Sequence, residues 1–239
     1  MAKKPSLNVV IPVYNEEVEL DKSVRAVHRY LTDHLSDFDW NITIADNAST
    51  DRTLAIAHKL ARSLSHIYVL HLDQKGRGRA VKTAWQSDHS DFVSYMDVDL
   101  STDLKHFSPM VRSLLGGYDV AIGSRNARGA RVYGRNILRT ITSIGYMLLI
   151  KLFFWVHFSD AQCGFKAVSR RVVEAVTPSI VDNEWFFDTE LLILAEKKGY
   201  RIYEEPVTWV DNPGSTVRVM KTAQGDLFGL LRLFITRPW

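Results

Sequence analysis

Hydrophobic runs alternate with helix-like patterns along the first half of the chain. Runs rich in β-branched residues and bounded by polar or glycine residues predict strands, and the stretches between them have the spacing of amphipathic helices. The predicted strands are 7–13, 40–45, 66–72 and 92–96, and the predicted helices are 17–35, 51–64 and 78–87. Strands that alternate with helices are typical of a parallel sheet covered by helices. We therefore expect an α/β fold with a mostly parallel central sheet flanked by helices.

The second half of the chain has a mixed pattern. Strands are predicted near 120–123 and within 200–210, on either side of long helices. Two stretches, 144–158 and 227–235, are unusually hydrophobic. Neither reaches the uninterrupted run of about 18 apolar residues that we require of a transmembrane helix, so we expect no span. Such stretches can be core helices or can lie in a bilayer interface.

Length and composition fit a single domain. A chain of 239 residues, 46% of them hydrophobic, can bury one large core. Cys163 is the sole cysteine, which excludes an intramolecular disulfide, and the first residues lack the apolar run of a secretory signal. These features predict a cytoplasmic protein. A net charge of +3 is too small to predict a nucleic-acid-binding protein.

The strongest local signal is Asp97-Val98-Asp99, which directly follows the strand 92–96. Two carboxylates at positions i and i+2 of a strand end can bind one hard cation that bridges a diphosphate. Aspartates are common in surface loops, so the position at the end of a strand gives this pair its weight. In open α/β sheets ligands bind at these strand ends. The pair predicts a site for Mg²⁺ or Mn²⁺.

Polar loops follow the other predicted strands. Asn15, Glu16 and Asp46 could contact a base or ribose, although Asn15 could equally cap the next helix. The loop 75–79 (KGRGR) is basic and contains glycines, so its backbone N–H groups and cations could approach a phosphate. It matches neither the G-x-x-x-x-G-K-[ST] nor the G-x-G-x-x-G spacing, which argues against an ATPase or a dinucleotide-binding protein.

Eight motifs together resemble family 2 glycosyltransferases. In chain order they are IPVYNEE, DNASTD, KGRGRAV, DVDLS, GSR, DAQCGFKA, FFDTELL and EEPVTW, and they extend from about residue 7 to residue 232. The sequence is most similar to the polyprenyl-phosphate glycosyltransferases, the group that contains dolichyl-phosphate glucosyl- and mannosyltransferases. The resemblance implies a single-domain GT-A fold, a nucleotide-diphosphate-sugar donor, a divalent metal ion and inversion at the anomeric carbon. We place the domain at 1–225 and an amphipathic, membrane-associated segment at 226–239.

The resemblance also implies the donor site. The nucleotide would be held by Pro12, Tyr14, Glu16 and Asp46, and the metal ion and diphosphate by Asp97 and Asp99. A basic segment with Ser215 would cover the diphosphate. The predicted donor-binding residues are Pro12, Tyr14, Asn15, Glu16, Asp46, Lys75, Arg79, Asp97, Val98, Asp99, Arg218 and Lys221.

One residue departs from the pattern of the mannosyl enzymes. Some of those relatives have a glutamine as a further metal ligand, where this chain has Ser101. The difference favours a UDP-sugar over GDP-mannose, although glucose, N-acetylhexosamine and mannose all remain open.

A lipid phosphate acceptor is already an anion, so it needs cations to position it rather than a strong base. Arg125 and Arg139, with Ser143 one turn later on a predicted helix, resemble the acceptor-phosphate clamp of the family, with Arg135 nearby in reserve. Arginine suits this task because its planar fork binds phosphate bidentately. The alternative is a solvated helix face. The hydrophobic stretch 144–158 would follow the polyprenyl tail.

Asp188 and Glu190 are paired carboxylates at a predicted helix start. The wider family places a catalytic carboxylate near this position. Because a phosphate acceptor needs no deprotonation, we predict that these two residues orient the acceptor. The alternative is that they complement a helix dipole. A nucleophilic role for Cys163 is disfavoured, since a small buried thiol is the commoner role of such a residue.

The predicted function is inverting transfer of a sugar from a nucleotide sugar to polyprenyl phosphate. The enzyme would sit peripherally on the cytoplasmic side of a membrane, where a small membrane-spanning partner could hold it. A transferase that acts on a saccharide hydroxyl is the main alternative, and there Asp188 or Glu190 would be a true base. A nucleotidyltransferase would show an arginine-containing, glycine-rich motif near the first strand, where this chain has PVYNEE. A non-catalytic binding module is disfavoured by the intact aspartates and arginines.

Overall fold

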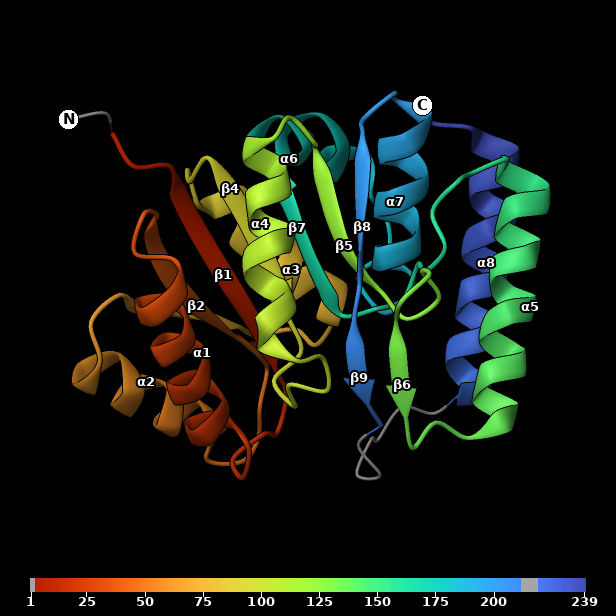
Figure 1. Ribbon diagram of the computed structural model, residues 1–239. Helices are drawn as coiled ribbons and strands as arrows, with labels where there is room; N and C mark the ends of the chain where they lie inside the picture. Colours follow the sequence, from red (N-terminus) through yellow and green to blue (C-terminus); the bar gives the residue numbers. More distant parts are fainter. Residues whose placement is uncertain (1–2, 212–218) are drawn as a thin grey trace.

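The computed structural model describes residues 3–211 and 219–239, without the side chains of 219–223. A seven-stranded sheet of order β3-β2-β1-β4-β7-β5-β8 forms its centre (Figure 1). The strands are β1 (Ser6–Val13), β2 (Asp39–Asn47), β3 (Ile67–Leu72), β4 (Phe92–Met96), β5 (Val120–Ser124), β7 (Phe165–Ser169) and β8 (Ile202–Pro206). Only β7 runs antiparallel to its neighbours among these strands. The mostly parallel sheet confirms the predicted fold class.

Strand β7 of the central sheet was not predicted from the sequence pattern. It lies between β4 and β5 and is antiparallel to both. Its second residue, Lys166, is fully buried, whereas a lysine in a short run argues against a core strand. The ammonium group is compensated by an ion pair with Asp188 at 3.0 Å. A long-range partner therefore makes this strand possible.

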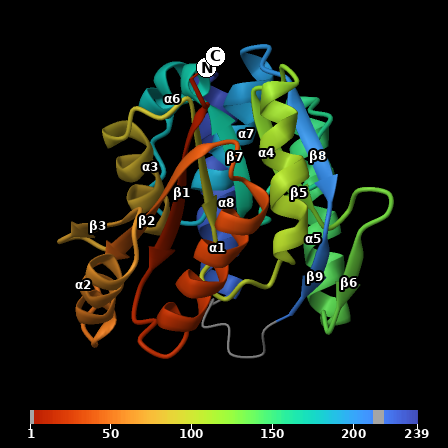
Figure 2. The same ribbon diagram turned by 60° about the vertical axis from the view of Figure 1, so that its left-hand side comes forward.

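Helices cover both faces of the sheet, and Figure 2 shows these layers from a second side. On one face lie α1 (Leu20–His34), α2 (Thr53–Ser63) and α4 (Phe107–Leu115), preceded by the 3₁₀ turn η1 (Leu104–His106). On the other lie α3 (Arg77–Ser87), α6 (Arg170–Val176) and α7 (Phe187–Lys197), with the 3₁₀ turn η2 (Thr177–Ser179). The three helices predicted in the first half are thus confirmed. Helix α1 begins at Leu20 rather than at residue 17, because residues 17–19 form a turn.

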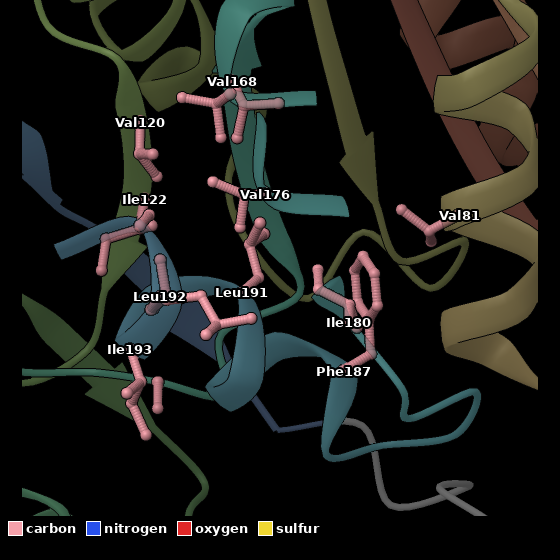
Figure 3. Close-up of a cluster of buried hydrophobic side chains, with 14 of the residues drawn as sticks. Val81, Val120, Ile122, Val168, Val176, Ile180, Phe187, Leu191, Leu192 and Ile193 are labelled. Atoms are coloured by element: carbon pink, nitrogen blue, oxygen red, sulfur yellow. The ribbon is translucent and has the colours of Figure 1, made fainter. Parts of the chain in front are cut away.

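A hydrophobic cluster fills each side of the sheet. Figure 3 shows part of the cluster beneath α7, where Val120, Ile122 and Val168 of the strands lie near Leu191 and Leu192. Helix α7 is buried at every position from Phe187 to Ala195. A helix that is buried all round belongs to the core, so the charged residues on α7 are interior groups.

Two further helices, α5 (Ile137–Phe154) and α8 (Val219–Thr236), lie side by side beyond α7 (Figure 1). The rings of Phe153 and Phe234 meet at 5.5 Å. Only Met147, Ile150 and Phe154 of α5 are buried. By length and composition alone α5 could cross a membrane, with a mean hydropathy of 1.6 over 18 residues. The expectation that no segment has these properties is therefore corrected, because the requirement of an uninterrupted apolar run was too strict.

A small parallel sheet of β6 (Arg131–Tyr133) and β9 (Thr208–Val210) connects the main sheet to α5. It brings Asp211 next to the start of α5, since Asp211 N donates to the carbonyl of Tyr133 at 2.9 Å. The predicted C-terminal segment 226–239 is not separate in the structure. It continues α8, which begins at Val219.

Candidate active site

The carboxylates of Asp97 and Asp99 lie at the end of β4, where the sequence predicted a metal site. Asp97 N donates to the carbonyl of Gly164 at 3.1 Å, and its Oδ1 accepts from Arg77 Nη2 at 2.7 Å. Asp99 accepts from the backbone N–H of Ser101 at 3.0 Å and from its hydroxyl at 2.8 Å. The intervening Val98 is buried. Ser101 thus orients an aspartate here.

Negative charge accumulates around this pair. Burial raises the pKa of Glu16 to about 7, and the charges of Asp99 and Asp97 add to the increase. Burial also raises the pKa of Asp97, an effect that Arg77 opposes and Asp99 reinforces. Clustered carboxylate oxygens that repel one another fit a hard divalent cation.

The carboxylates would hold a metal ion only in part. Among the described residues, no three histidine, cysteine or acidic side chains converge closely enough to enclose one. Asp97 and Asp99 would therefore share the ion with water and substrate oxygens, as Mg²⁺ sites with few protein ligands do.

The loops that follow β1 and β2 are tied to each other. Asn15 Oδ1 accepts from Thr50 N at 2.8 Å, and Glu16 N donates to the hydroxyl of Thr53 at 2.7 Å. The side chain of Asn15 therefore holds the two loops together. The capping alternative is wrong, because α1 follows Glu19, which makes no side-chain cap. Tyr14 is half-buried and carries the ammonium of Lys75 at 3.3 Å from its ring centroid. These two predicted donor-binding residues form a cation–π pair between the loop after β1 and the loop before α3.

Asp46 and Pro12 are buried rather than exposed to a ligand. Asp46 Oδ2 accepts from His71 Nδ1 at 2.7 Å, and no described residue bonds its Oδ1. Its predicted contact with the nucleotide stays a prediction. The neighbouring Asn47 was not predicted, yet its Oδ1 accepts from Gly76 N at 2.6 Å and so fixes the basic loop to β2.

The backbone of the basic loop does not form the predicted phosphate cradle. Gly78 N and Arg79 N donate to the carbonyls of Glu184 and Asn183, at 3.2 and 3.0 Å. A Cβ on Gly76 would lie 2.6 Å from the carbonyl oxygen of Asn183. The glycines therefore permit close packing of this loop against the start of α7. The donor-binding role of Lys75 and Arg79 stays a prediction, and it would rest on their side chains alone.

Arg77, at the centre of the basic loop, is a functional residue that the sequence reading missed. Its side chain is 10% exposed, and its Nη1 contacts Asp188 Oδ2 at 2.7 Å while Nη2 contacts Asp97. Lys166 Nζ lies 3.0 Å from Asp188 Oδ1, which also accepts from the hydroxyl of Tyr95. The two cations and two carboxylates form a neutral cluster that is buried except at Asp97, whose side chain is 42% exposed. The two glycines that flank Arg77 were the one feature of the sequence that could have drawn attention to it.

Asp188 and Glu190 lie inside the protein. Burial raises the pKa of Asp188, but Lys166 and Arg77 outweigh it and hold that pKa below its usual value. Glu190 is fully buried and contacts Arg232 Nη1 at 2.8 Å. This geometry contradicts a direct catalytic contact for either carboxylate, because neither reaches a surface where a substrate could bind. Their role in orienting the acceptor stays a prediction.

The predicted acceptor clamp is partly occupied by acidic partners. Arg125 Nε and Nη2 contact the two oxygens of Asp160 at 2.7 and 2.9 Å. Burial opposes the ionised form of Asp160, but Arg125 lowers its pKa to about 2. Arg139 Nη1 contacts Asp211 at 2.8 Å, and Ser143 lies half-buried one turn later on α5. Both arginines are where the sequence predicted, but their carboxylate partners were not foreseen.

Three predicted residues of the donor cover fall outside what can be described. Ser215 and Arg218 lie outside the described residues, and so does the side chain of Lys221. Cys163 is described: it is buried, and burial raises the pKa of its thiol to about 11. A thiol in that state is a poor nucleophile at neutral pH.

Known proteins resemble this chain in sequence and in fold. Residues 8–177 match the sequence model described as Glycosyl transferase family 2. The chain belongs to glycosyl transferase family 2. It is therefore a glycosyltransferase, and the aspartate pair at the end of β4 lies within the part of the chain that defines the family.

The sequences of several relatives match nearly the whole chain. The glycosyltransferase AglD of Haloferax volcanii is 35% identical over 95% of this chain and 36% of its own length. The dolichyl-phosphate beta-glucosyltransferase of Dictyostelium discoideum is 29% identical over 87% of this chain and 68% of its own length. This chain thus spans about a third of AglD and about two thirds of the glucosyltransferase.

Solved structures confirm the GT-A fold of this family 2 chain. Glucosyl-3-phosphoglycerate synthase of Mycobacterium tuberculosis, in complex with Mn²⁺, UDP-glucose and phosphoglyceric acid, superposes with a TM-score of 0.69. The identity is 18%, over 96% of this chain and 79% of that chain. At this identity the comparison establishes the shared fold.

Proposed function

We propose that this chain transfers a sugar from a nucleoside-diphosphate sugar to a dolichyl-type polyprenyl phosphate, with inversion at the anomeric carbon. The observation that carries the proposal is that a carboxylate pair, a set of arginines and an exposed apolar helix follow one another. The carboxylates of Asp97 and Asp99 lie near Arg125, the first of five arginines within residues 125–139, and the last of the five lies on the exposed apolar helix α5. The charge of Asp97 acts on Arg125, so the two parts are close. An acceptor with an anionic head and a hydrocarbon tail matches this arrangement.

The relatives support the acceptor and the donor. Several of them are named dolichyl-phosphate beta-glucosyltransferases, and the solved structures of the synthase contain Mn²⁺ with UDP or UDP-glucose. We propose Mg²⁺ or Mn²⁺ as the cofactor and a UDP-sugar as the donor, with glucose as the first sugar to test. Asp97 and Asp99 would hold the ion, which neutralises the diphosphate as it leaves.

The residues of the chain account for the remaining chemistry. An oxygen of the acceptor phosphate attacks the anomeric carbon, that new C–O bond forms, and the bond to the diphosphate breaks on the opposite face. The attacking oxygen is already ionised, so no general base is required. Arginines orient it, while Arg77 fixes the carboxylate of Asp97.

The apolar face of α5 and α8 would place the enzyme on a membrane. Leu148 and Leu152 of α5 are 63% and 70% exposed, and Phe228 and Ile235 of α8 are 73% and 70% exposed. An exposed apolar face with nearby arginines is typical of helices that lie in a bilayer interface. We propose peripheral attachment on the cytoplasmic side, where a membrane-spanning partner could assist.

A saccharide hydroxyl acceptor is less well supported. That reaction needs a general base, and the two carboxylates predicted for the role are buried in ion pairs with Arg77, Lys166 and Arg232.

The test is a donor panel with a short polyprenyl phosphate. Purified protein is incubated with Mn²⁺ and each of UDP-glucose, UDP-N-acetylglucosamine and GDP-mannose, and products are read by mass spectrometry. We expect one donor to give a polyprenyl-phosphate-sugar, and Asp99→Ala to abolish it. No product from any donor, with one donor consumed on a hydroxyl acceptor, would refute the proposal.

A further inference from the structure

The five arginines between β5 and the first turn of α5 include one partly buried charge without an acidic partner in the described part of the chain. Five arginines occur over residues 125–139. Arg128 and Arg131 are exposed to solvent, and Arg125 and Arg139 are paired with carboxylates. Arg135 differs from all four, because it is only partly exposed and no described carboxylate lies within ion-pair distance. Residues 212–218 add no candidate, since NPGSTVR contains neither Asp nor Glu.

The surroundings of Arg135 make this charge costly without a partner. Burial lowers the pKa of Arg135, and the positive charges of Arg125 and Arg139 lower it further, although Asp160 and Asp211 act in the opposite sense. Arg125 with Asp160 and Arg139 with Asp211 are each neutral pairs, so Arg135 leaves a net positive charge. A partly buried cation among other cations is stabilised by an anion.

The local backbone fixes Arg135 at this place. Gly134, with φ of 74°, adopts a conformation that other residues rarely take, and a Cβ there would lie 3.6 Å from the Cβ of Asp211. Asn136 caps α5, because its Oδ1 accepts from Leu138 N at 2.9 Å. Arg135 therefore sits between the small β6–β9 sheet and the positive end of the α5 dipole.

We propose that Arg135 is the principal ligand of the acceptor's phosphate group. Arg125 and Arg139 then act as scaffolding whose remaining N–H groups assist. This inference rests on the proposed function for the identity of the acceptor. A phosphate monoester carries up to two negative charges near neutral pH, and a guanidinium fork with no carboxylate partner can bind two of its oxygens.

A lipid is the favoured source of the phosphate. Directly after Arg135, the side chains of Ile137, Leu138 and Ile141 are 76%, 67% and 61% exposed. A water-soluble phosphate would gain nothing from these apolar groups, whereas a hydrocarbon tail would cover them.

The experiment measures binding of citronellyl phosphate by calorimetry, with inorganic phosphate and citronellol as the other two probes. Arg135→Met should weaken citronellyl phosphate binding by about tenfold or more, since a hydrogen bond to a charged group is lost. The matched control Arg131→Met, from the same segment and exposed, should bind within about twofold of wild type, the change expected of a surface residue. Inorganic phosphate should bind more weakly than citronellyl phosphate, and citronellol should not bind.

Other results would overturn the inference. If Arg135→Met binds like wild type while Arg139→Met does not, the paired arginines hold the phosphate. Equal losses in Arg131→Met and Arg135→Met would show a diffuse charge effect, and equal affinity for inorganic phosphate would overturn the lipid source. Thermal unfolding of Arg135→Met at the wild-type temperature excludes a folding defect, and Arg135→Lys should recover part of the affinity.

This design separates the two proposals. Binding that depends on Arg135 without any transfer to a lipid phosphate would refute the proposed function alone. Transfer that Arg135→Met leaves unchanged, in both KM for the lipid and kcat, would refute the inference alone.

Discussion

Arg77, Lys166, Asp97 and Asp188 balance two positive against two negative charges, and Asp97 is the member that reaches the surface. The ion pairs of Arg77 with Asp97 and Asp188 are each 2.7 Å long. Buried ions of this kind are stable only as a set, because the loss of one leaves its partners charged and unpaired. Arg77 thereby connects the first aspartate of the metal site with the core helix α7.

Arg77→Met should destabilise the fold strongly. Two carboxylates would lose their shared cation, and breaking a buried pair typically costs about 3–5 kcal/mol. Urea denaturation at pH 7.5 measures the free energy of unfolding. The control is Arg52→Met, whose pair with Glu17 lies on the surface, and there we expect little change. A loss no larger than that of the control would contradict the cluster's role.

Gly164 illustrates how a residue without a side chain can define a site. A Cβ at this position would overlap the carboxylate of Asp97. Gly164→Ala should therefore displace a metal ligand, and a misplacement of about 1 Å can reduce turnover by about a hundredfold. Gly145→Ala on α5 is the control, since a Cβ there meets nothing within 4 Å. Equal turnover in the two variants would show that Asp97 tolerates movement.

Helix α8 is attached to the core by buried polar contacts as well as by apolar packing. Gln162 Nε2 donates to Asp226 Oδ2 at 2.7 Å, and Arg232 contacts Glu190. Gly229 faces Phe186 without room for a Cβ. These contacts fix the position of α8 against α7, while the other face of α8 is apolar and exposed.

Asp226 makes this attachment sensitive to pH. Burial raises its pKa to about 7, and the charges of Asp182 and Asp188 contribute. The folded state thus binds a proton more tightly than the unfolded state, so stability is full below about pH 4 and is lost as the pH rises to about 7. Asp226→Asn should be more stable than wild type at pH 8, by at most about 4 kcal/mol. Both proteins should unfold at similar temperatures near pH 4, and a wild type that is no less stable at pH 8 would contradict this reading.

The exposed face of α5 should bind lipid. Leu148→Ser with Leu152→Ser removes two exposed leucines, each worth about 1.5–3 kcal/mol when fully buried. We expect binding to anionic vesicles to weaken by about a hundredfold, measured by co-sedimentation, with the unfolding temperature unchanged. The control is Val18→Ser, because Val18 is 82% exposed and is far in sequence from α5. Unchanged sedimentation of the double variant would refute the docking face.

At the scale of the whole molecule, the alternating pattern predicted the strands and the polar loops at their ends. The prediction worked because each strand of a parallel sheet is a short hydrophobic run, and the carboxyl ends of the parallel strands lie at one edge of the sheet. The aspartate pair and Arg125 and Arg139 follow from such local motifs. Their partners do not, since Arg77 and Asp188 are separated by 111 residues and Arg139 and Asp211 by 72. For the same reason the short strand β7, which depends on the pairing of Lys166, was not predicted.

The whole fold places the carboxylate pair near Arg125, and a further cation, Arg139, on the apolar helix α5. That order is the central claim: the donor binds at the aspartates, and the acceptor arrives from a lipid surface with a phosphate as its reacting group. A hydroxyl acceptor would require a general base, and both carboxylates predicted for that role, Asp188 and Glu190, are held in ion pairs.

The most direct measurement compares two acceptors that differ only in the phosphate. Purified protein is given Mn²⁺, the donor identified by the panel, and either a short polyprenyl phosphate or the corresponding polyprenol, and the products are identified by mass spectrometry. We predict a sugar on the phosphate compound alone, abolished by a chelator and by Asp99→Ala. Transfer to the polyprenol, or to neither compound while a saccharide accepts the sugar, would contradict the account.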